Sequence, residues 1–188
     1  MRNLRPIAAA AALALMIPLA GCSDTESTDE AGATQASGTL ASAIGGDSDH
    51  ATLSSALTEA GLADVFDGPG SYTILAPNDS AFNSAGKVLE GEEHRAELVA
   101  VLRGHILPGH LTPDAIRKAV AAKKGPVTVT TLDDGEVTFS VDGDTITVAG
   151  ADGSKAMVEG DPLVATNGVV LPLNGLVKKA PPAPAPAG

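Results

Sequence analysis

The chain has 188 residues and a formal net charge of −11, and its core must be largely aliphatic because it contains one Tyr, three Phe and no Trp. This charge excludes nucleic acids and anionic lipid headgroups as electrostatic partners, since both are polyanions. The length suits one domain with its own core and hardly two. With a single cysteine, Cys22, the chain has no internal disulfide and no thiolate metal site.

The N-terminus has the composition of an export signal. Arg2 and Arg5 form a positive segment, and residues 7–19 form an apolar run that is shorter than the roughly 20 residues needed to span a bilayer. The sequence Leu19-Ala20-Gly21-Cys22 resembles the lipobox of bacterial lipoproteins. This resemblance implies that the signal peptide, residues 1–21, is removed and that Cys22 receives the lipid. We therefore expect an exported protein of a bacterial cell envelope, anchored to a membrane through Cys22; the alternative is an ordinary secretory signal with a chance cysteine.

Composition divides the rest of the chain into three parts. Residues 22–39 are rich in Ser, Thr, Gly, Ala and acidic residues and contain no aromatic residue, so they are predicted to form a flexible acidic tether. Residues 180–188 form an Ala/Pro-rich tail of extended or disordered character. Residues 40–179 between them are predicted to form the folded domain.

The first half of this domain has the periodicity of short helices. A first helix is predicted from apolar residues spaced at i, i+3, i+4 and i+7, namely Leu53, Ala56, Leu57 and Ala60. Asp49 would cap its N-terminus, and Gly61 would end it. Tyr72–Ala76 is predicted as a strand ended by Pro77, with Asp79 as the cap of the short helix that follows.

Two further helices are predicted before the pattern changes. The first covers residues 92–103 and ends before Gly104. The second has Thr112 as its N-cap and ends before Gly125. Its buried face is predicted to contain Ile116, Ala119 and Val120.

In the second half the apolar period changes to two. Pairs of Asp and Gly between the alternating runs, such as Asp142-Gly143 and Asp152-Gly153, predict tight turns and hence an antiparallel meander. The last strands are separated by Asn167-Gly168 and Asn174-Gly175, which we expect to supply the positive φ of tight turns. The predicted fold class is therefore α+β, with helices first and the sheet second.

Three segments resemble signatures of the fasciclin domain in their order and spacing. Tyr72–Phe82 resembles the first signature, an apolar strand followed by Ala-Pro-Thr-Asp/Asn-x-Ala-Phe, and Ala165–Val177 resembles the second, which begins with Asn-Gly-Val. Leu102–Leu111 is similar to the Tyr-His segment of the family. The resemblance covers roughly residues 40–179 and implies a single fasciclin-like domain, a compact β-sandwich or wedge flanked by short helices.

The chain departs from the family pattern at three positions. Gly104 replaces the Tyr of the Tyr-His segment, Leu171 replaces the His of the second signature, and Asn174 replaces its Asp. The integrin binding associated with the Tyr-His region in animal relatives is therefore not carried over to this chain. His105 keeps the family position and is a candidate partner-binding residue; the alternative is a histidine that is hydrogen-bonded within the fold.

No pattern in the chain points to catalysis, a cofactor or a metal. The sequence has no Gly-x-Ser-x-Gly nucleophile motif and no Gly-rich phosphate loop. His105 and His110 lack the spacing of helical metal ligands, and Asp142-Gly143-Asp144 fits a hairpin turn better than a calcium loop. One basic cluster is interpreted either as a solvated helix face or as a docking patch for an acidic glycan or protein: Arg117, Lys118, Lys123 and Lys124.

These features predict a lipid-anchored, non-enzymatic adhesion or binding module of a bacterial envelope. Its expected partners are cell-surface or matrix proteins or glycans. A periplasmic carrier or sensor of a small apolar ligand is the alternative, and a hydrolase with a polar cleft is a third hypothesis.

Overall fold

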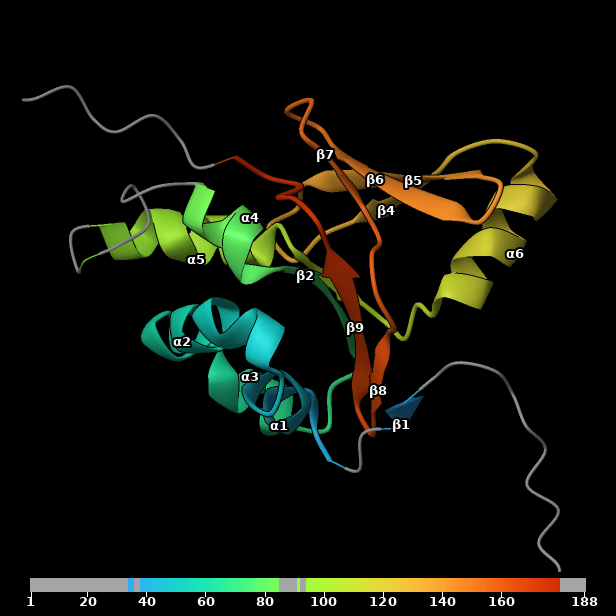
Figure 1. Ribbon diagram of the computed structural model, residues 1–188. Coiled ribbons are helices and arrows are strands. Elements are labelled where there is room, and N and C mark those ends of the chain that lie inside the picture. Colours follow the sequence, from blue (N-terminus) through green and yellow to red (C-terminus); the bar gives the residue numbers. More distant parts are fainter. Residues whose placement is uncertain (1–33, 36–37, 85–90, 92–93, 180–188) are drawn as a thin grey trace, which may run out of the picture. The chain divides into compact units, whose positions relative to one another are not determined.

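The computed structural model describes residues 34–35, 38–84, 91 and 94–179. The predicted signal peptide, Cys22, the predicted tail and most of the predicted tether lie outside these residues. The described residues form two β-sheets and a set of short helices (Figure 1). The helices are α1 Leu40–Gly45, the 3₁₀ turn η1 Ser48–His50, α2 Ala51–Glu59, α3 Ala63–Asp67, α4 Asp79–Ser84, α5 Arg95–Arg103 and α6 Pro113–Lys123. The strands are β1 Thr34–Gln35, β2 Tyr72–Pro77, β3 Ile106–Pro108, β4 Val127–Thr130, β5 Glu136–Asp142, β6 Thr145–Gly150, β7 Lys155–Met157, β8 Leu163–Ala165 and β9 Gly168–Leu173.

The larger sheet has the strand order β1-β8-β9-β2-β3. β2 and β9 are parallel neighbours, with Tyr72 opposite Gly168 and Pro77 opposite Leu173. β3 and β8 pair with them in antiparallel orientation. The fold is α+β as predicted, but the expected order of helices first and sheet second has an exception, because β2 and β3 come from the helical half and join the last strands of the chain.

The smaller sheet is the antiparallel meander that the alternating pattern predicted. Its strand order is β4-β5-β6-β7. Val137 and Phe139 of β5 and Ile146 and Val148 of β6 are buried, as expected for strands with one covered face. Gly143, in the β5–β6 turn, has a φ of 56°, which supplies the positive φ that such a hairpin turn requires.

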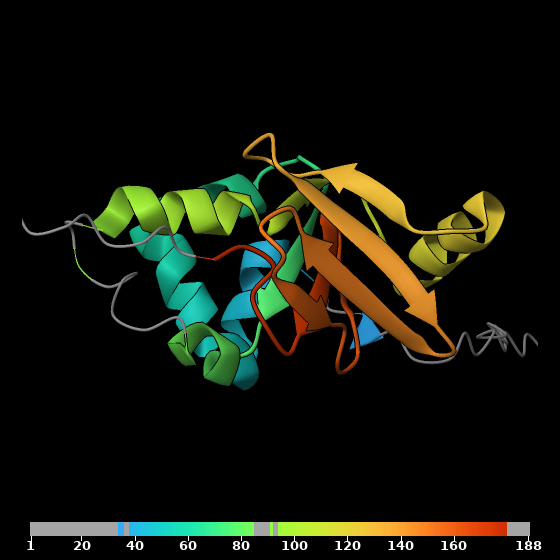
Figure 2. The same ribbon diagram turned by 90° about the horizontal axis from the view of Figure 1, so that it is seen from above.

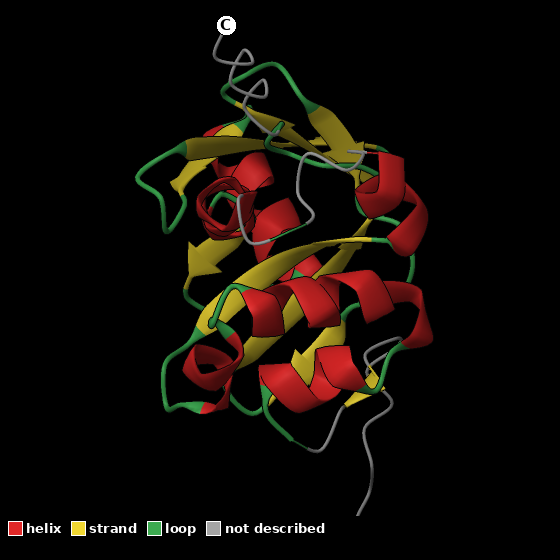
Figure 3. Cartoon of the chain, turned by 90° about the vertical axis from the view of Figure 1, so that its left-hand side faces the viewer, coloured by secondary structure: helices red, strands yellow, loops and turns green. Residues whose placement is uncertain are grey.

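The central strands β2 and β9 of the larger sheet are buried on both faces, and apolar residues form one cluster on each side of them. Ile74 and Ala76 of β2 and Val170 of β9 pack with α1–α5, whereas Leu75 and Leu171 pack with the meander and α6. Figures 1 and 2 show α1–α5 on one side of β2 and β9 and the meander on the other, and Figure 3 is seen from the helical side. Strands covered on both faces are continuous apolar runs, which explains why β2 and β9 show no alternation in the sequence.

The C-terminus of α2 follows the prediction. Gly61 has a φ of 71°. The N–H groups of Gly61 and Leu62 donate to the carbonyl oxygens of Thr58 and Leu57 at 3.0 and 2.9 Å. This is a Schellman motif, which satisfies carbonyl groups at the end of the helix.

The N-terminal caps of α2 and α4 differ from the prediction. Asp49 lies in η1 and does not cap α2. Instead, Oδ1 of Asp79 in α4 accepts a hydrogen bond from the N–H of Thr52 in the first turn of α2, at 2.9 Å. α4 is capped by Asn78, whose Oδ1 accepts from the N–H of Ala81 at 2.8 Å. The predicted roles of Asp49 and Asp79 are therefore wrong, because Asn78 occupies the cap position and leaves the Asp79 carboxylate for a neighbouring helix.

Gly168 is required by close packing rather than by a turn. Neither Gly168 nor Gly175 is among the described residues with positive φ, which corrects the prediction for both Asn-Gly pairs. A Cβ atom on Gly168 would overlap the backbone carbonyl oxygen of Tyr72 in the neighbouring strand. Glycine therefore allows β9 to approach β2.

Asn167 holds two helices to the β8–β9 turn, at one end of the interior strands of the larger sheet. Its Oδ1 accepts a hydrogen bond from the N–H of Leu40 at 2.8 Å. Its Nδ2 donates to the carbonyl oxygens of Phe66 and Gly68 at 2.7 and 2.9 Å. The side chain thus connects the start of α1 and the end of α3 with the β8–β9 turn.

The ordered domain begins before the predicted boundary at Leu40. β1 pairs in parallel with β8. The carbonyl oxygen of Gly38 accepts hydrogen bonds from the N–H and the hydroxyl of Thr166 at 2.9 and 3.0 Å. Thr39 is the N-cap of α1. The last residues assigned to the tether therefore belong to the fold.

The two ends of α6 follow the sequence, but its buried face is narrower than predicted. Oγ1 of Thr112 accepts from the N–H of Ala115 at 3.2 Å, as an N-cap does. Ile116 is buried and Val120 is partly buried, whereas Ala119 is exposed.

Among the described residues, no helix has the length and apolar character needed to cross a bilayer.

Candidate functional site

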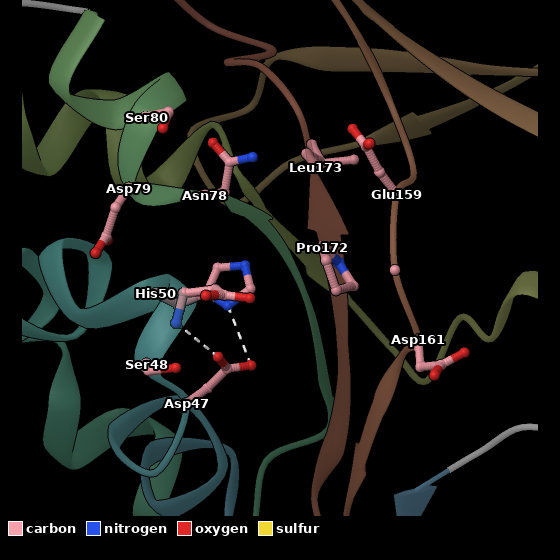
Figure 4. A pocket seen from close by; sticks show the side chains of 12 residues that line it. Asp47, Ser48, His50, Asn78, Asp79, Ser80, Glu159, Asp161, Pro172 and Leu173 are labelled. Carbon is pink, nitrogen blue, oxygen red and sulfur yellow. Dashed lines mark hydrogen bonds and ion pairs between the residues drawn. The ribbon is translucent and has the colours of Figure 1, made fainter.

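A pocket of about 520 Å³ lies at the N-terminal ends of α2 and α4, beside the β7–β8 connection (Figure 4). The residues around it are mainly polar, and five of them are carboxylic acids. They are Asp47, Ser48, Asp49, His50, Asn78, Asp79, Ser80, Glu159, Gly160, Asp161, Pro172 and Leu173.

The end of β9 brings these segments together. The N–H of Asn78 donates to the carbonyl oxygen of Leu173 at 2.9 Å, and the N–H of Glu159 donates to that of Pro172 at 2.9 Å. An isolated β-bridge joins Val158 to Leu173. The first and second halves of the chain therefore meet at the pocket through backbone hydrogen bonds to one strand.

His50 is the buried polar residue of the pocket. It is 3% exposed, and its ring stands between Asp47 and Asn78 in Figure 4. Its Nδ1 lies 3.2 Å from Oδ2 of Asp47 without the geometry of a hydrogen bond, and its Nε2 has no hydrogen-bond partner among the described residues. In the neutral tautomer with its proton on Nδ1, toward the Asp47 carboxylate, Nε2 is an acceptor.

The carboxylates around the pocket fall into two groups. Asp47 and Asp79 accept backbone hydrogen bonds, from the N–H groups of Asp49 and Thr52, both at 2.9 Å. The side chains of the other three, Asp49, Glu159 and Asp161, are exposed and take part in no ion pair within the described part of the chain.

The pocket contains acceptors and negative charge, with no Lys or Arg in its lining. Such a site attracts positively charged groups and repels anions. In the ranges that the structure describes, no group of three or more His, Cys, Asp or Glu side chains could hold a metal ion.

His105, the candidate that the sequence proposed for partner binding, is part of the core. It is 1% exposed. Its Nδ1 bonds to the carbonyl oxygen of Val101 at 2.9 Å, and its Nε2 accepts from the N–H of Val177 at 3.0 Å. Burial lowers the pKa of His105 from 6.5 to about 4, although the hydrogen bond to Val101 acts in the opposite direction. The ring is neutral near pH 7 and offers no nitrogen to a partner, which is the alternative that the sequence left open.

The basic cluster lies along α6 and its C-terminus. Lys118, Lys123 and Lys124 are exposed. Arg117 instead donates a hydrogen bond to the carbonyl oxygen of Asp144 at 3.0 Å and lies 3.7 Å from Oδ1 of Asp114. Arg117 therefore links α6 to the β5–β6 turn, whereas the three lysines are exposed. Cys22 lies outside the described residues.

Sequence reasoning did not find the pocket. Its residues come from segments around positions 50, 79, 160 and 172, and no spacing in the sequence connects them. His50 lies next to a predicted helix cap, and nothing in its surroundings marks it as buried. The pairing of β2 with β9 brings the segments around 79 and 172 together. The bridge from Val158 to Leu173 adds the segment around 160, and the hydrogen bond from Thr52 to Asp79 adds the segment around 50.

The sequence is similar to known proteins. A sequence model of the Fasciclin domain matches residues 48–177. Protein sll1483 of Synechocystis is 28% identical over 155 residues, which cover 77% of this chain and 85% of that protein. Transforming growth factor-beta-induced protein ig-h3 of Sus scrofa is 28% identical over 124 residues, 63% of this chain and only 16% of the pig protein.

A solved structure has a similar fold. It is a FAS1 domain pair from the insect cell adhesion molecule fasciclin I, with a TM-score of 0.60 and 26% sequence identity. The match covers 71% of this chain and 46% of the domain pair. The chain thus corresponds to about half of that two-domain structure.

Proposed function

Since the chain belongs to the fasciclin domain family, we propose that it is a non-enzymatic binding module, anchored by lipid to a membrane of a bacterial cell envelope. Its partners are proteins or glycans of cell surfaces or of a matrix. The observation that carries this proposal is the family match over residues 48–177, together with the likeness to domains of an insect cell adhesion molecule.

Lipid anchoring is supported by the sequence around Cys22. Leu19-Ala20-Gly21-Cys22 follows an apolar run that is too short to span a bilayer. Two or more acyl chains give stable membrane attachment, and many copies held at one surface convert weak single contacts into strong attachment. The anchor is therefore part of the proposed adhesion mechanism.

A binding role also agrees with the chemistry of the described residues. His105 has both nitrogens engaged, so it cannot act as a general base without losing a hydrogen bond of the core. The pocket is lined by acidic residues, which does not favour the alternative of a carrier for an apolar ligand.

Adhesion is tested with the lipidated full-length chain, reconstituted at high density in liposomes. These liposomes are incubated with cells of the same species, with host cells and with envelope polysaccharide, and retained lipid is measured. We expect retention on at least one surface, which falls steeply as the protein density is lowered. Retention no higher than that of protein-free liposomes on every surface would overturn the proposal.

The anchor is tested separately with Cys22→Ser. We expect this variant to leave the membrane fraction while its domain keeps the circular dichroism spectrum and unfolding midpoint of the parent. A variant that stays in the membrane fraction would contradict the anchor and leave the binding function to be judged by the liposome experiment.

A further inference from the structure

Resting on the binding function above, we propose that the pocket at the start of α2 and α4 binds an organic cation with an ammonium or guanidinium group. The cation is either a basic side chain of a partner protein or a free amine. Two independent observations support this chemistry: uncompensated acidic side chains, and a buried histidine with an unused acceptor nitrogen.

The first observation is the charge around the pocket. Five carboxylates and no Lys or Arg line it. Asp49, Glu159 and Asp161 are exposed and form no ion pair with another described residue. Like charges gathered at one opening repel one another, and a bound cation removes this repulsion.

The second observation is His50. The side chain is 3% exposed, yet its Nε2 has no partner among the described residues. A buried polar atom without a hydrogen bond is costly. In the neutral ring whose proton lies on Nδ1, toward the carboxylate of Asp47, Nε2 carries the lone pair and its partner is a donor. An N–H group of an ammonium or guanidinium ion is such a donor.

Other ligand classes fit the pocket less well. An anion would meet the carboxylates, and the first-turn N–H groups of Thr52 and Ala81, which could attract one, already donate to Asp79 and Asn78. The described side chains that could bind a metal do not converge on one point. An organic cation carries several N–H donors on one group, so it can bridge acceptors that are too far apart to share a metal ion.

Binding is measured by NMR on the full-length chain with Cys22→Ser, because the pocket does not involve the anchor. The probes are agmatine, the peptide acetyl-Gly-Ser-Arg-Ser-Gly-amide, and the same peptide with neutral citrulline in place of arginine. We expect amide shifts at the pocket for a cationic probe and none for the citrulline peptide. Binding of the arginine peptide alone indicates a partner protein as the source, and binding of agmatine alone a free amine; both support the cation site. No pocket shift with either cation, or equal shifts with the citrulline peptide, would overturn it.

Matched variants separate the pocket from the general negative charge. Glu159→Gln with Asp161→Asn removes two exposed acids at the pocket. Asp142→Asn with Asp144→Asn removes the same charge from the exposed β5–β6 turn. We expect the first pair to weaken binding about tenfold or more, as for lost charge-assisted hydrogen bonds, and the second less than about twofold. Equal weakening by both pairs would contradict a specific site.

The nitrogen shifts of the His50 ring provide a direct readout. We expect an unprotonated Nε2 in the free protein and a change at Nε2 when the cation binds. A proton on Nε2 in the free protein would overturn the acceptor role. These measurements do not depend on adhesion, so a chain that binds agmatine but no cell surface would count against the proposed adhesion function and not against the cation site.

Discussion

The surroundings of two buried histidines differ, although their burial is almost the same. His105 is 1% and His50 is 3% exposed. Both nitrogens of His105 are used, by α5 and by the segment after β9, whereas neither nitrogen of His50 has a hydrogen bond within the described residues. Burial alone therefore does not distinguish a structural histidine from a binding one. The hydrogen bonds of the ring do.

The largest effect on stability is expected from removing the ring of His105, whose two nitrogens are both hydrogen-bonded. His105→Ala leaves the buried N–H of Val177 without an acceptor and creates a cavity, so we expect the free energy of unfolding to fall by about 3 to 4 kcal/mol. Urea denaturation of the Cys22→Ser chain measures this loss. His110→Ala at an exposed position is the control, with an expected change below about 0.5 kcal/mol. A loss below about 1 kcal/mol at His105 would show that the two hydrogen bonds matter little.

The pH dependence of stability should report the same residue. Burial lowers the pKa of His105 from 6.5 to about 4, so the unfolded chain binds a proton at a higher pH than the folded chain does. The neutral His105 ring therefore contributes to the free energy of unfolding. The contribution is complete above pH 6.5 and is lost as the pH falls towards 4, by about 3 kcal/mol. Urea midpoints measured across this range should fall less steeply for His105→Gln, which has no titrating ring. If the urea midpoints of the two proteins fell equally steeply with pH, the lowered pKa of His105 would not be the cause of the pH dependence.

A smaller effect is expected beside His50, at the cap that α4 gives to α2. Asp79→Ala removes the acceptor for the N–H of Thr52 and should cost about 1 to 2 kcal/mol of unfolding free energy. Asp49→Ala, at the cap position predicted from the sequence, should change it by less than about 0.5 kcal/mol. Urea denaturation of both variants decides between the two caps, and the reverse order of effects would restore the sequence-based assignment.

The smallest expected effect on stability is at His50 itself. His50→Leu replaces a buried polar ring that has no partner with an apolar side chain of similar length. We therefore expect the free energy of unfolding to change by no more than about 1 kcal/mol, and it can rise. The same variant should lose the response of the pocket to agmatine. If His50→Leu instead destabilises the domain as strongly as His105→Ala, the contrast between the two histidines disappears.

Most of the fold could be predicted from local patterns. The alternation in β5 and β6 and the cap at Thr112 each depend on neighbouring residues, and the structure confirms them. The Asn167-Gly168 pair predicts a turn with positive φ, and the structure has the β8–β9 turn there but not the positive φ. The two residues also hold two helices and allow two strands to approach closely, and these roles depend on residues far away in the sequence.

The candidate site could not be predicted for the same reason. Asp79 follows Asn78, and either residue type can cap a helix. Only the position of α2 shows that Asp79 accepts from Thr52. His50 and Glu159 have no motif in common and line the same pocket only because their segments pack beside the end of β9.

The parallel pairing of β2 with β9 also sets the order in which the chain can fold. Roughly a hundred residues separate Tyr72 from its partner Gly168, so the larger sheet cannot close until the second signature has been synthesised. Contacts of such long range make folding slow. Until Gly168 has been added to the growing chain, β2 has no parallel partner and neither apolar cluster can close around the larger sheet. A chain truncated before Gly168 would lack the strand that contributes to both apolar clusters and would leave them exposed to water.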